Sequence, residues 1–166
     1  NLAALLSPLA PSFKMTTMIS TSAEPCMPRL SVVVPAFNEE ENIIPLAEEI
    51  IAALGQLPGG FELILVDDKS TDSSAQVIQN FMHPNVRAVF HRINCGQSSA
   101  VASGFQAARG DWVATLDGDG QNDPADLPAM LEQAIKAGVD CVTGVRSKRQ
   151  DNFIRRFSSK AANGFR

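Results

Sequence analysis

From residue 30 onward, short apolar runs rich in valine, isoleucine and leucine alternate with longer stretches in which apolar residues recur every three or four positions. A short run bounded by turn residues is typical of a buried strand, and the longer recurrence is typical of an amphipathic helix. The predicted strands cover residues 30–37, 61–66, 86–91, 111–116 and 139–145, with a helix in each interval. This alternation predicts an α/β fold, with a mostly parallel sheet covered by helices on both faces.

The predicted helices carry signals for where they begin and end. The first is expected to follow Asn42 as its N-terminal cap and to stop at Gly55. The last is expected to begin at Asp123 and Pro124, a capping residue followed by a proline in the first helical position. The residues expected to face the core include Ala75, Ile78 and Met82 in the second helix and Leu127, Met130, Leu131, Ala134 and Ile135 in the last.

Charge is distributed unevenly along the 166 residues, although the net charge is only -4. Residues 1–145 hold seven Lys or Arg against 17 Asp or Glu, so this part of the chain repels polyanions and no nucleic-acid partner is expected. Residues 146–166 hold seven basic residues against Asp151 alone, and could attract a phosphate. The basic residues of this tail are Arg146, Lys148, Arg149, Arg155, Arg156, Lys160 and Arg166.

The cysteine content favours a reducing compartment, because Cys26, Cys95 and Cys141 are too few and too scattered for a disulfide framework. Cys95 and Cys141 are interpreted as small apolar residues, and His91 as a hydrogen-bonded core or edge histidine and not a ligand. Residues 1–28 are rich in Ser, Thr, Ala and Pro, and we interpret them as a disordered N-terminal extension of a domain that covers residues 29–166.

Polar residues follow several predicted strands at the edge where parallel α/β sheets bind ligands. Neither GxGxxG nor GxxxxGK[ST] occurs, and an EF-hand loop starting at Asp117 would place Asn122 where glycine is needed. A response-regulator receiver could use Asp67, Asp68 and Asp117, but it leaves the segment after the first strand without a role. Asp117 and Asp119 flank Gly118 and can project to the same side, as a diphosphate-bound cation requires. A solvated turn would carry the same residues.

Five segments in order resemble family 2 glycosyltransferases. They are "VVVPAFNEEENI", "LILVDDKSTDSS", "NCGQSSAVASGFQAARGD", "LDGDGQNDPADLP" and "GVRSKRQDNFIRRFSSKAAN". The resemblance covers residues 30–166 and is greatest to the dolichyl-phosphate mannosyltransferase type, which transfers sugars to polyprenyl phosphates. It implies a GT-A (Rossmann-like) fold and inverting transfer of a sugar from a nucleotide diphosphate.

The resemblance also implies roles for individual residues, each carried over by its place in a motif. Asp117, Gly118 and Asp119 match the DxD motif, so Asp117 and Asp119 are expected to hold Mg²⁺ or Mn²⁺, with Asp119 the more direct ligand. Arg146 matches a basic residue that faces the phosphates or the acceptor, and with Asp119 it is the predicted catalytic pair. The remaining residues expected to contact the nucleotide sugar are Pro35, Phe37, Glu39, Val66, Asp68 and Gln121.

The expected partners are a GDP- or UDP-sugar donor and a polyprenyl phosphate (dolichyl or undecaprenyl) at a membrane surface. The expected location is therefore the cytoplasm, peripheral to the cytosolic face of a membrane. Because the family domain normally continues further, the chain is interpreted as C-terminally incomplete, with the donor-binding half present. A non-catalytic nucleotide-sugar-binding fragment is the alternative to an active transferase.

Overall fold

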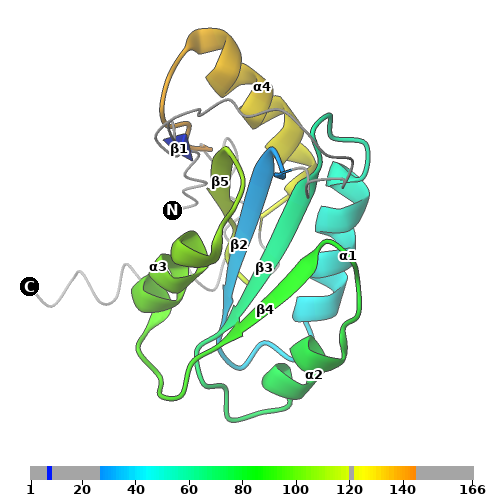
Figure 1. The fold of residues 1–166 in the computed structure, drawn as a ribbon. Helices are drawn as coiled ribbons and strands as arrows, with labels where there is room; N and C mark the ends of the chain where they lie inside the picture. Colours follow the sequence, from blue (N-terminus) through cyan, green and yellow to red (C-terminus); the bar gives the residue numbers. More distant parts are fainter. Residues whose placement is uncertain (1–6, 9–26, 120–121, 145–166) are drawn as a thin grey trace, which may run out of the picture.

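The fold is a four-stranded parallel sheet with one short antiparallel strand added at its edge (Figure 1). It was obtained as a computed structural model that describes residues 7–8, 27–119 and 122–144. The parallel strands are β2 (Leu30–Ala36), β3 (Phe61–Asp67), β4 (Val86–Phe90) and β5 (Trp112–Thr115). All seven residues of β2 and of β3 are buried, as continuous apolar strands covered on both faces require. The predicted α/β fold with a parallel sheet is confirmed.

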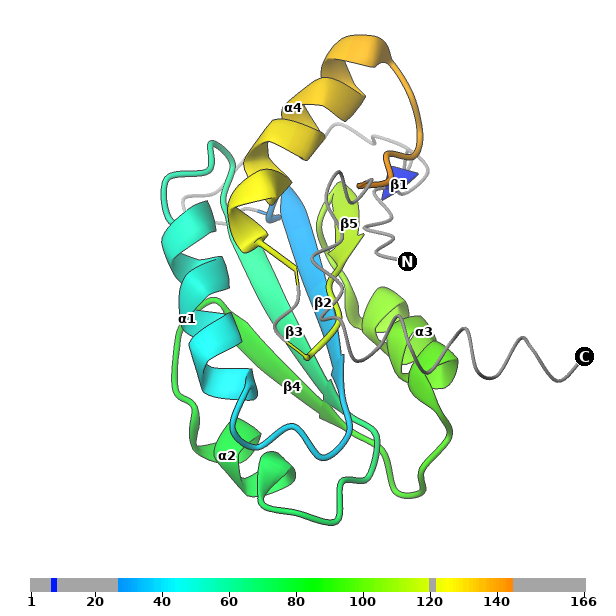
Figure 2. The same ribbon diagram turned by 180° about the vertical axis from the view of Figure 1, so that it is seen from behind.

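Helices cover the two faces of the sheet unequally (Figures 1 and 2). On one face, α1 (Ile43–Leu54), α2 (Ser74–Asn80) and α4 (Leu127–Ala137) enclose the larger core, and a 3₁₀ turn, η1 (Pro124–Asp126), leads into α4. On the other face, α3 (Gln97–Ala107) packs on β2 and β3 over a smaller core. The larger core depends on α1, whose residues Ile43, Leu46, Ala47, Ile50 and Leu54 are all at least 98% buried.

The strand order β1-β5-β2-β3-β4 creates a switch point at β2. The chain runs outward from β2 through β3 to β4. It then crosses back through α3 and adds β5 on the other side of β2. At such a point the loops after neighbouring strands leave in opposite directions and open a crevice at the carboxyl ends. The helix that makes this crossing lies very close to the sheet, because a Cβ at Gly104 of α3 would lie only 2.2 Å from Cγ1 of Val33.

A buried polar network at the opposite, amino-terminal end of the sheet fixes the end of α3. The Glu62 side chain accepts hydrogen bonds from Ser31 Oγ (2.7 Å), the Arg109 backbone N–H (2.7 Å) and Arg87 Nη1 (2.8 Å). Arg87 Nη1 also donates to the carbonyl of Ala107, the last residue of α3. The network neutralises a carboxylate that would otherwise be buried without a counter-charge.

The predicted fifth strand is wrong for residues 139–144, which form no strand. The outer edge of β5 is instead paired with β1 (Ser7–Pro8), in antiparallel register with Ser7 opposite Val113. A glycine in the left-handed conformation, Gly138 (φ 62°), ends α4, and the Val139 N–H donates back to Ala134. The N-terminal extension was predicted to be disordered. Residues 1–6 and 9–26 of this extension lie outside the described part of the chain.

Two residues expected in the core are exposed instead. Met82 is 89% exposed because α2 ends at Asn80, before the predicted boundary. Ile135 is 41% exposed because it lies in the last turn of α4, which projects beyond the end of the sheet (Figure 1). Asn42 precedes α1 as predicted, but its side chain donates to Glu39 Oε2 (2.6 Å) and does not cap the helix. Among the described helices, none combines the length and apolar character needed to cross a membrane.

Candidate nucleotide-binding site

A cavity of about 460 Å³ lies at the carboxyl ends of the parallel strands. Its walls come from four places in the chain: the end of β2, the end of β3, the loop between β4 and α3, and the loop after β5. Seven of the predicted site residues line it: Pro35, Phe37, Glu39, Asp68, Asp117, Gly118 and Asp119. Residues as far apart in the sequence as Pro35 and Asp119 therefore converge on one cavity, as the switch-point rule anticipates.

The loop after β5 presents two carboxylates to this cavity. Asp117 is partly buried and Asp119 is exposed, and both line the cavity with Gly118 between them. Asp117 Oδ1 accepts a hydrogen bond from Gln97 Nε2 (2.8 Å), at the first residue of α3. A Cβ at position 118 would lie 2.9 Å from the Pro35 carbonyl oxygen, so only glycine lets this loop approach the end of β2 so closely. Glycine is therefore required at position 118 because the loop after β5 packs closely against the end of β2.

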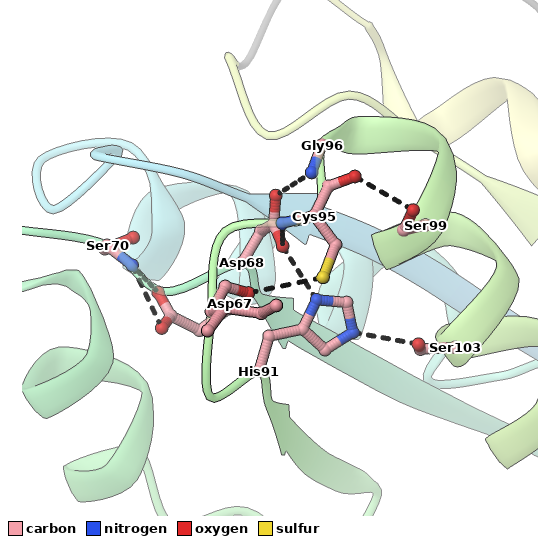
Figure 3. A network of polar contacts seen from close by, with 9 residues as sticks. Asp67, Asp68, Ser70, His91, Cys95, Gly96, Ser99 and Ser103 are labelled. Carbon is pink, nitrogen blue, oxygen red and sulfur yellow. Dashed lines mark hydrogen bonds and ion pairs between the residues drawn. The ribbon is translucent and has the colours of Figure 1, made fainter.

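Asp68, directly after β3, is a carboxylate of the cavity wall that several hydrogen bonds hold in place (Figure 3). It is 97% buried, with Oδ1 accepting from the Cys95 N–H (2.9 Å) and Oδ2 from the Gly96 N–H (2.6 Å). Oδ1 also lies 2.7 Å from His91 Nδ1. Burial alone would raise the pKa of Asp68, but the hydrogen bonds from Cys95, His91 and Gly96 together lower it below its ordinary value.

His91 joins the end of β4 to α3. Its backbone N–H donates to the Asp67 carbonyl (2.9 Å), and its ring nitrogens contact Asp68 through Nδ1 and Ser103 Oγ through Nε2 (2.8 Å) (Figure 3). The hydrogen bonding expected of His91 is therefore present at both ring nitrogens. Cys95 and Cys141, interpreted from the sequence as small apolar residues, are both free and exposed.

A set of side-chain to backbone hydrogen bonds ties the loop after β2 to the loop after β3. Asn38 has a positive φ of 56°, and its Oδ1 accepts from the Thr71 N–H (2.8 Å). Glu40 Oε2 accepts from the Ser73 N–H (2.9 Å). The Asp67 side chain accepts only a long hydrogen bond (3.3–3.4 Å) from the Ser70 N–H, as a turn-capping residue does. These contacts hold the two loops together at one end of the cavity.

Some site residues were not found from the sequence, and some predicted ones lie elsewhere. Asn94, Gly96 and Gln97 line the cavity, and their signal was the "NCGQ" segment after the third predicted strand. Val66, predicted to grip the base and ribose, is fully buried in the core beneath α3 and does not line the cavity. Its side chain therefore packs against the helix. Gln121 and Arg146 lie outside the described residues.

Comparison with known proteins identifies the family. The sequence profile described as "Glycosyl transferase family 2" matches residues 31–165. An undecaprenyl-phosphate 4-deoxy-4-formamido-L-arabinose transferase from Pseudomonas fluorescens is 43% identical over 137 residues, which are 81% of this chain and 40% of that protein. A dodecaprenyl-phosphate galacturonate synthase from Rhizobium johnstonii is 41% identical over 138 residues, 81% of this chain and 41% of the relative. The chain thus spans about two fifths of the length of these relatives.

Solved structures agree on the fold. The mannosyltransferase PcManGT from Pyrobaculum calidifontis, in complex with GDP-Man and Mn²⁺, has a TM-score of 0.57 at 24% identity, covering 64% of this chain and 32% of its own. TarS from S. aureus in complex with UDP has a TM-score of 0.53 at 25% identity, covering 64% of this chain and 33% of its own. The chain has the GT-A fold and belongs to glycosyl transferase family 2.

Proposed function

We propose that this domain binds a nucleotide diphosphate sugar together with a divalent cation and transfers the sugar, with inversion, to a polyprenyl phosphate. The observation that carries the proposal is the convergence of Asp68, Asp117 and Asp119 on one cavity at the switch point of the sheet. The receiver-like alternative is set aside, because the chain belongs to family 2 and the end of β2 lines the same cavity.

The cavity offers separate groups for the two ends of the donor. Phe37 is 46% exposed at the cavity wall and offers an aromatic face for a nucleobase. Asp68 lies in the same wall with a lowered pKa, so it is a carboxylate acceptor for a base N–H at neutral pH. Asp117 and Asp119 line the same cavity and are the residues that would hold Mg²⁺ or Mn²⁺, because these ions prefer oxygen ligands.

A cation held there would supply positive charge next to the diphosphate as it leaves the sugar. Gln97 fixes the orientation of Asp117, so the carboxylate is positioned before the ligand arrives. A phosphate acceptor is already an anion near neutral pH, and its attack needs no general base. Gln121 and Arg146, which are predicted to contact the phosphates, lie outside the described part of the chain.

The proposed acceptor and location are supported by the relatives. Two of them are named for undecaprenyl-phosphate and dodecaprenyl-phosphate products, and both exceed 40% identity over four fifths of this chain. A lipid-phosphate acceptor lies at a membrane surface, so we place the domain in the cytoplasm, peripheral to the cytosolic face of a membrane.

Calorimetric titration with UDP and GDP, with Mg²⁺ or Mn²⁺ and then with a chelator, tests the site. We expect binding that requires the metal and is lost in Asp119→Ala and weakened in Asp117→Ala. Asp126→Ala is the matched control, because Asp126 is an exposed aspartate in η1, outside the residues that line the cavity. Equal affinity in the presence of chelator, or in Asp119→Ala, would refute the metal-dependent site.

A second assay separates a transferase from a domain that only binds donor. The chain is incubated with a polyprenyl phosphate and a nucleotide sugar, and release of the nucleotide diphosphate is measured. Release that depends on the lipid phosphate and on Asp119 supports transfer. Metal-dependent binding without release would support the non-catalytic alternative.

A further inference from the structure

Three side chains of different donor type meet at Asp68, which lines the cavity. A carboxylate oxygen of Asp68, a ring nitrogen of His91 and the Cys95 Sγ all lie within 4.8 Å of one another. They come from the end of β3, the end of β4 and the loop before α3, so the fold and not a local turn brings them together (Figure 3). The cluster is separate from Asp117 and Asp119, to which the proposed function assigns the donor's cation.

We propose that Asp68, His91 and Cys95 form a second metal site, selective for Zn²⁺-like ions over Mg²⁺ and Mn²⁺. One carboxylate oxygen, one imidazole nitrogen and one thiolate are ligands that Zn²⁺ accepts, whereas Mg²⁺ requires oxygen ligands. Three protein ligands leave the fourth tetrahedral position open to water.

The surroundings of His91 and Asp68 suit this role. Nδ1 of His91 lies 2.7 Å from Asp68 Oδ1 and in this arrangement carries the proton that it donates there. A metal at Nδ1 would replace that hydrogen bond. The proton would then sit on Nε2, which lies 2.8 Å from Ser103 Oγ and can donate to it, and Nδ1 would offer its lone pair to the metal. The backbone N–H groups of Cys95 and Gly96 hold the Asp68 carboxylate, and the same bonds keep Cys95 next to it.

Only small movements separate the present arrangement from a tetrahedral one. Two N or O ligands on one Zn²⁺ are about 3.3 Å apart, so the 2.7 Å contact between His91 Nδ1 and Asp68 Oδ1 must open slightly. The sulfur must approach the other two ligands to about 3.6 Å. Cys95 is exposed and its Sγ has only a 3.5 Å contact to the Ile93 carbonyl, so its side chain can rotate without disturbing the core.

Occupancy of this site would oppose donor binding, a consequence that rests on the proposed function. Asp68 lines the cavity, and a metal on its Oδ1 removes the acceptor assigned to the nucleobase. We infer that Zn²⁺ inhibits nucleotide binding while Mg²⁺ or Mn²⁺ at the other carboxylates supports it. Both ions would then act on the same cavity in opposite directions.

Co²⁺ titration of the complete 166-residue chain, followed by absorption, tests the site without any nucleotide. Cys26 and Cys141 are changed to Ser so that Cys95 is the remaining thiol. We expect a Co²⁺–thiolate charge-transfer band that saturates at one equivalent and disappears when Zn²⁺ is added. Cys95→Ser should abolish the band, and His91→Gln should weaken Co²⁺ binding at least tenfold, with His83→Gln as the matched control. Ser103→Ala should weaken it about tenfold through the tautomer of His91.

The band should persist in Asp119→Ala, because that residue belongs to the other site. Absence of the band at saturating Co²⁺, or its persistence in Cys95→Ser, would overturn the proposed site. Full affinity in His91→Gln would do the same, and circular dichroism checks that each variant is folded. In a second titration, Zn²⁺ should weaken UDP or GDP binding in the parent but not in Cys95→Ser.

The two proposals fail in different ways. Zn²⁺ binding with unchanged nucleotide affinity would overturn the inferred inhibition. A chain that binds no nucleotide under any metal condition would overturn the proposed function, and the Co²⁺ titration would still decide the second metal site.

Discussion

Replacing Asp68 with asparagine should destabilise the domain although the side chain keeps its shape. The carboxylate accepts from two backbone N–H groups, at 2.9 and 2.6 Å, and contacts the His91 ring at 2.7 Å. An amide retains one oxygen, so its NH₂ group must face a donor, either Gly96 N–H or the pair formed by Cys95 N–H and His91. Losing a charge-assisted hydrogen bond and leaving a donor unpaired together cost about 2–3 kcal/mol.

Urea denaturation of the parent and of Asp68→Asn measures this cost as a difference in the free energy of unfolding. Asp67→Asn is the matched control, because Asp67 is equally buried, is adjacent in sequence and accepts only a long bond from Ser70 N–H. We expect the control to lose less than about 1 kcal/mol.

The cost should also depend on pH. Because the pKa of Asp68 is lowered in the folded state, its contribution is complete above its ordinary value of 3.8 and is lost as the pH falls through the lowered folded value. The difference between parent and Asp68→Asn should therefore be constant near neutrality and shrink only below about pH 3.8. An equal loss in Asp67→Asn, or a difference that does not shrink in acid, would refute the role assigned to the carboxylate.

Three further predictions concern other parts of the chain. Gly118→Ala should cost about 1–3 kcal/mol and weaken nucleotide binding, because its Cβ would lie 2.9 Å from the Pro35 oxygen; parent-like thermal stability would contradict this. Glu62→Ala should cost about 3 kcal/mol in urea denaturation but leave nucleotide affinity unchanged, because its network lies at the opposite end of the sheet. The basic residues Arg155, Arg156 and Lys160 should bind anionic lipid vesicles in a salt-sensitive way, each contributing about 1 kcal/mol, as measured by co-sedimentation. Binding that survives replacement of all three by Gln would contradict this prediction.

The sequence was most informative where one local signal decides the structure. The bounds of α1 follow from its apolar stripe and Gly55, and β2 and β3 follow from continuous apolar runs. The segment 139–144 has the same kind of composition but forms no strand, and the outer edge of β5 is paired with β1. The local sequence pattern does not indicate whether a segment will find a strand edge with which to pair.

The site was predictable to the extent that its residues directly follow a strand. Asp68 directly follows β3 and Asp117 lies two residues after β5, and both strands end at the same edge of the parallel sheet. The contacts that orient them join Cys95 to a residue 27 positions away and Gln97 to one 20 positions away. Such pairs form because α3 crosses over the sheet, and the periodicity of the sequence does not encode that crossing. For the same reason Val66 was predicted to contact the ligand, although its side chain packs in the core beneath α3.

The seating of α3 on β2 links the evolution of the core to that of the site. Gly104 leaves no room for a side chain above Val33, while the same helix carries Gln97 and Ser103, the partners of Asp117 and His91. A larger residue at 104 would lift the helix and draw both partners away from the cavity. Residues 33 and 104 should therefore change as a pair among relatives, with added bulk at one position offset by its loss at the other, although neither residue lines the cavity.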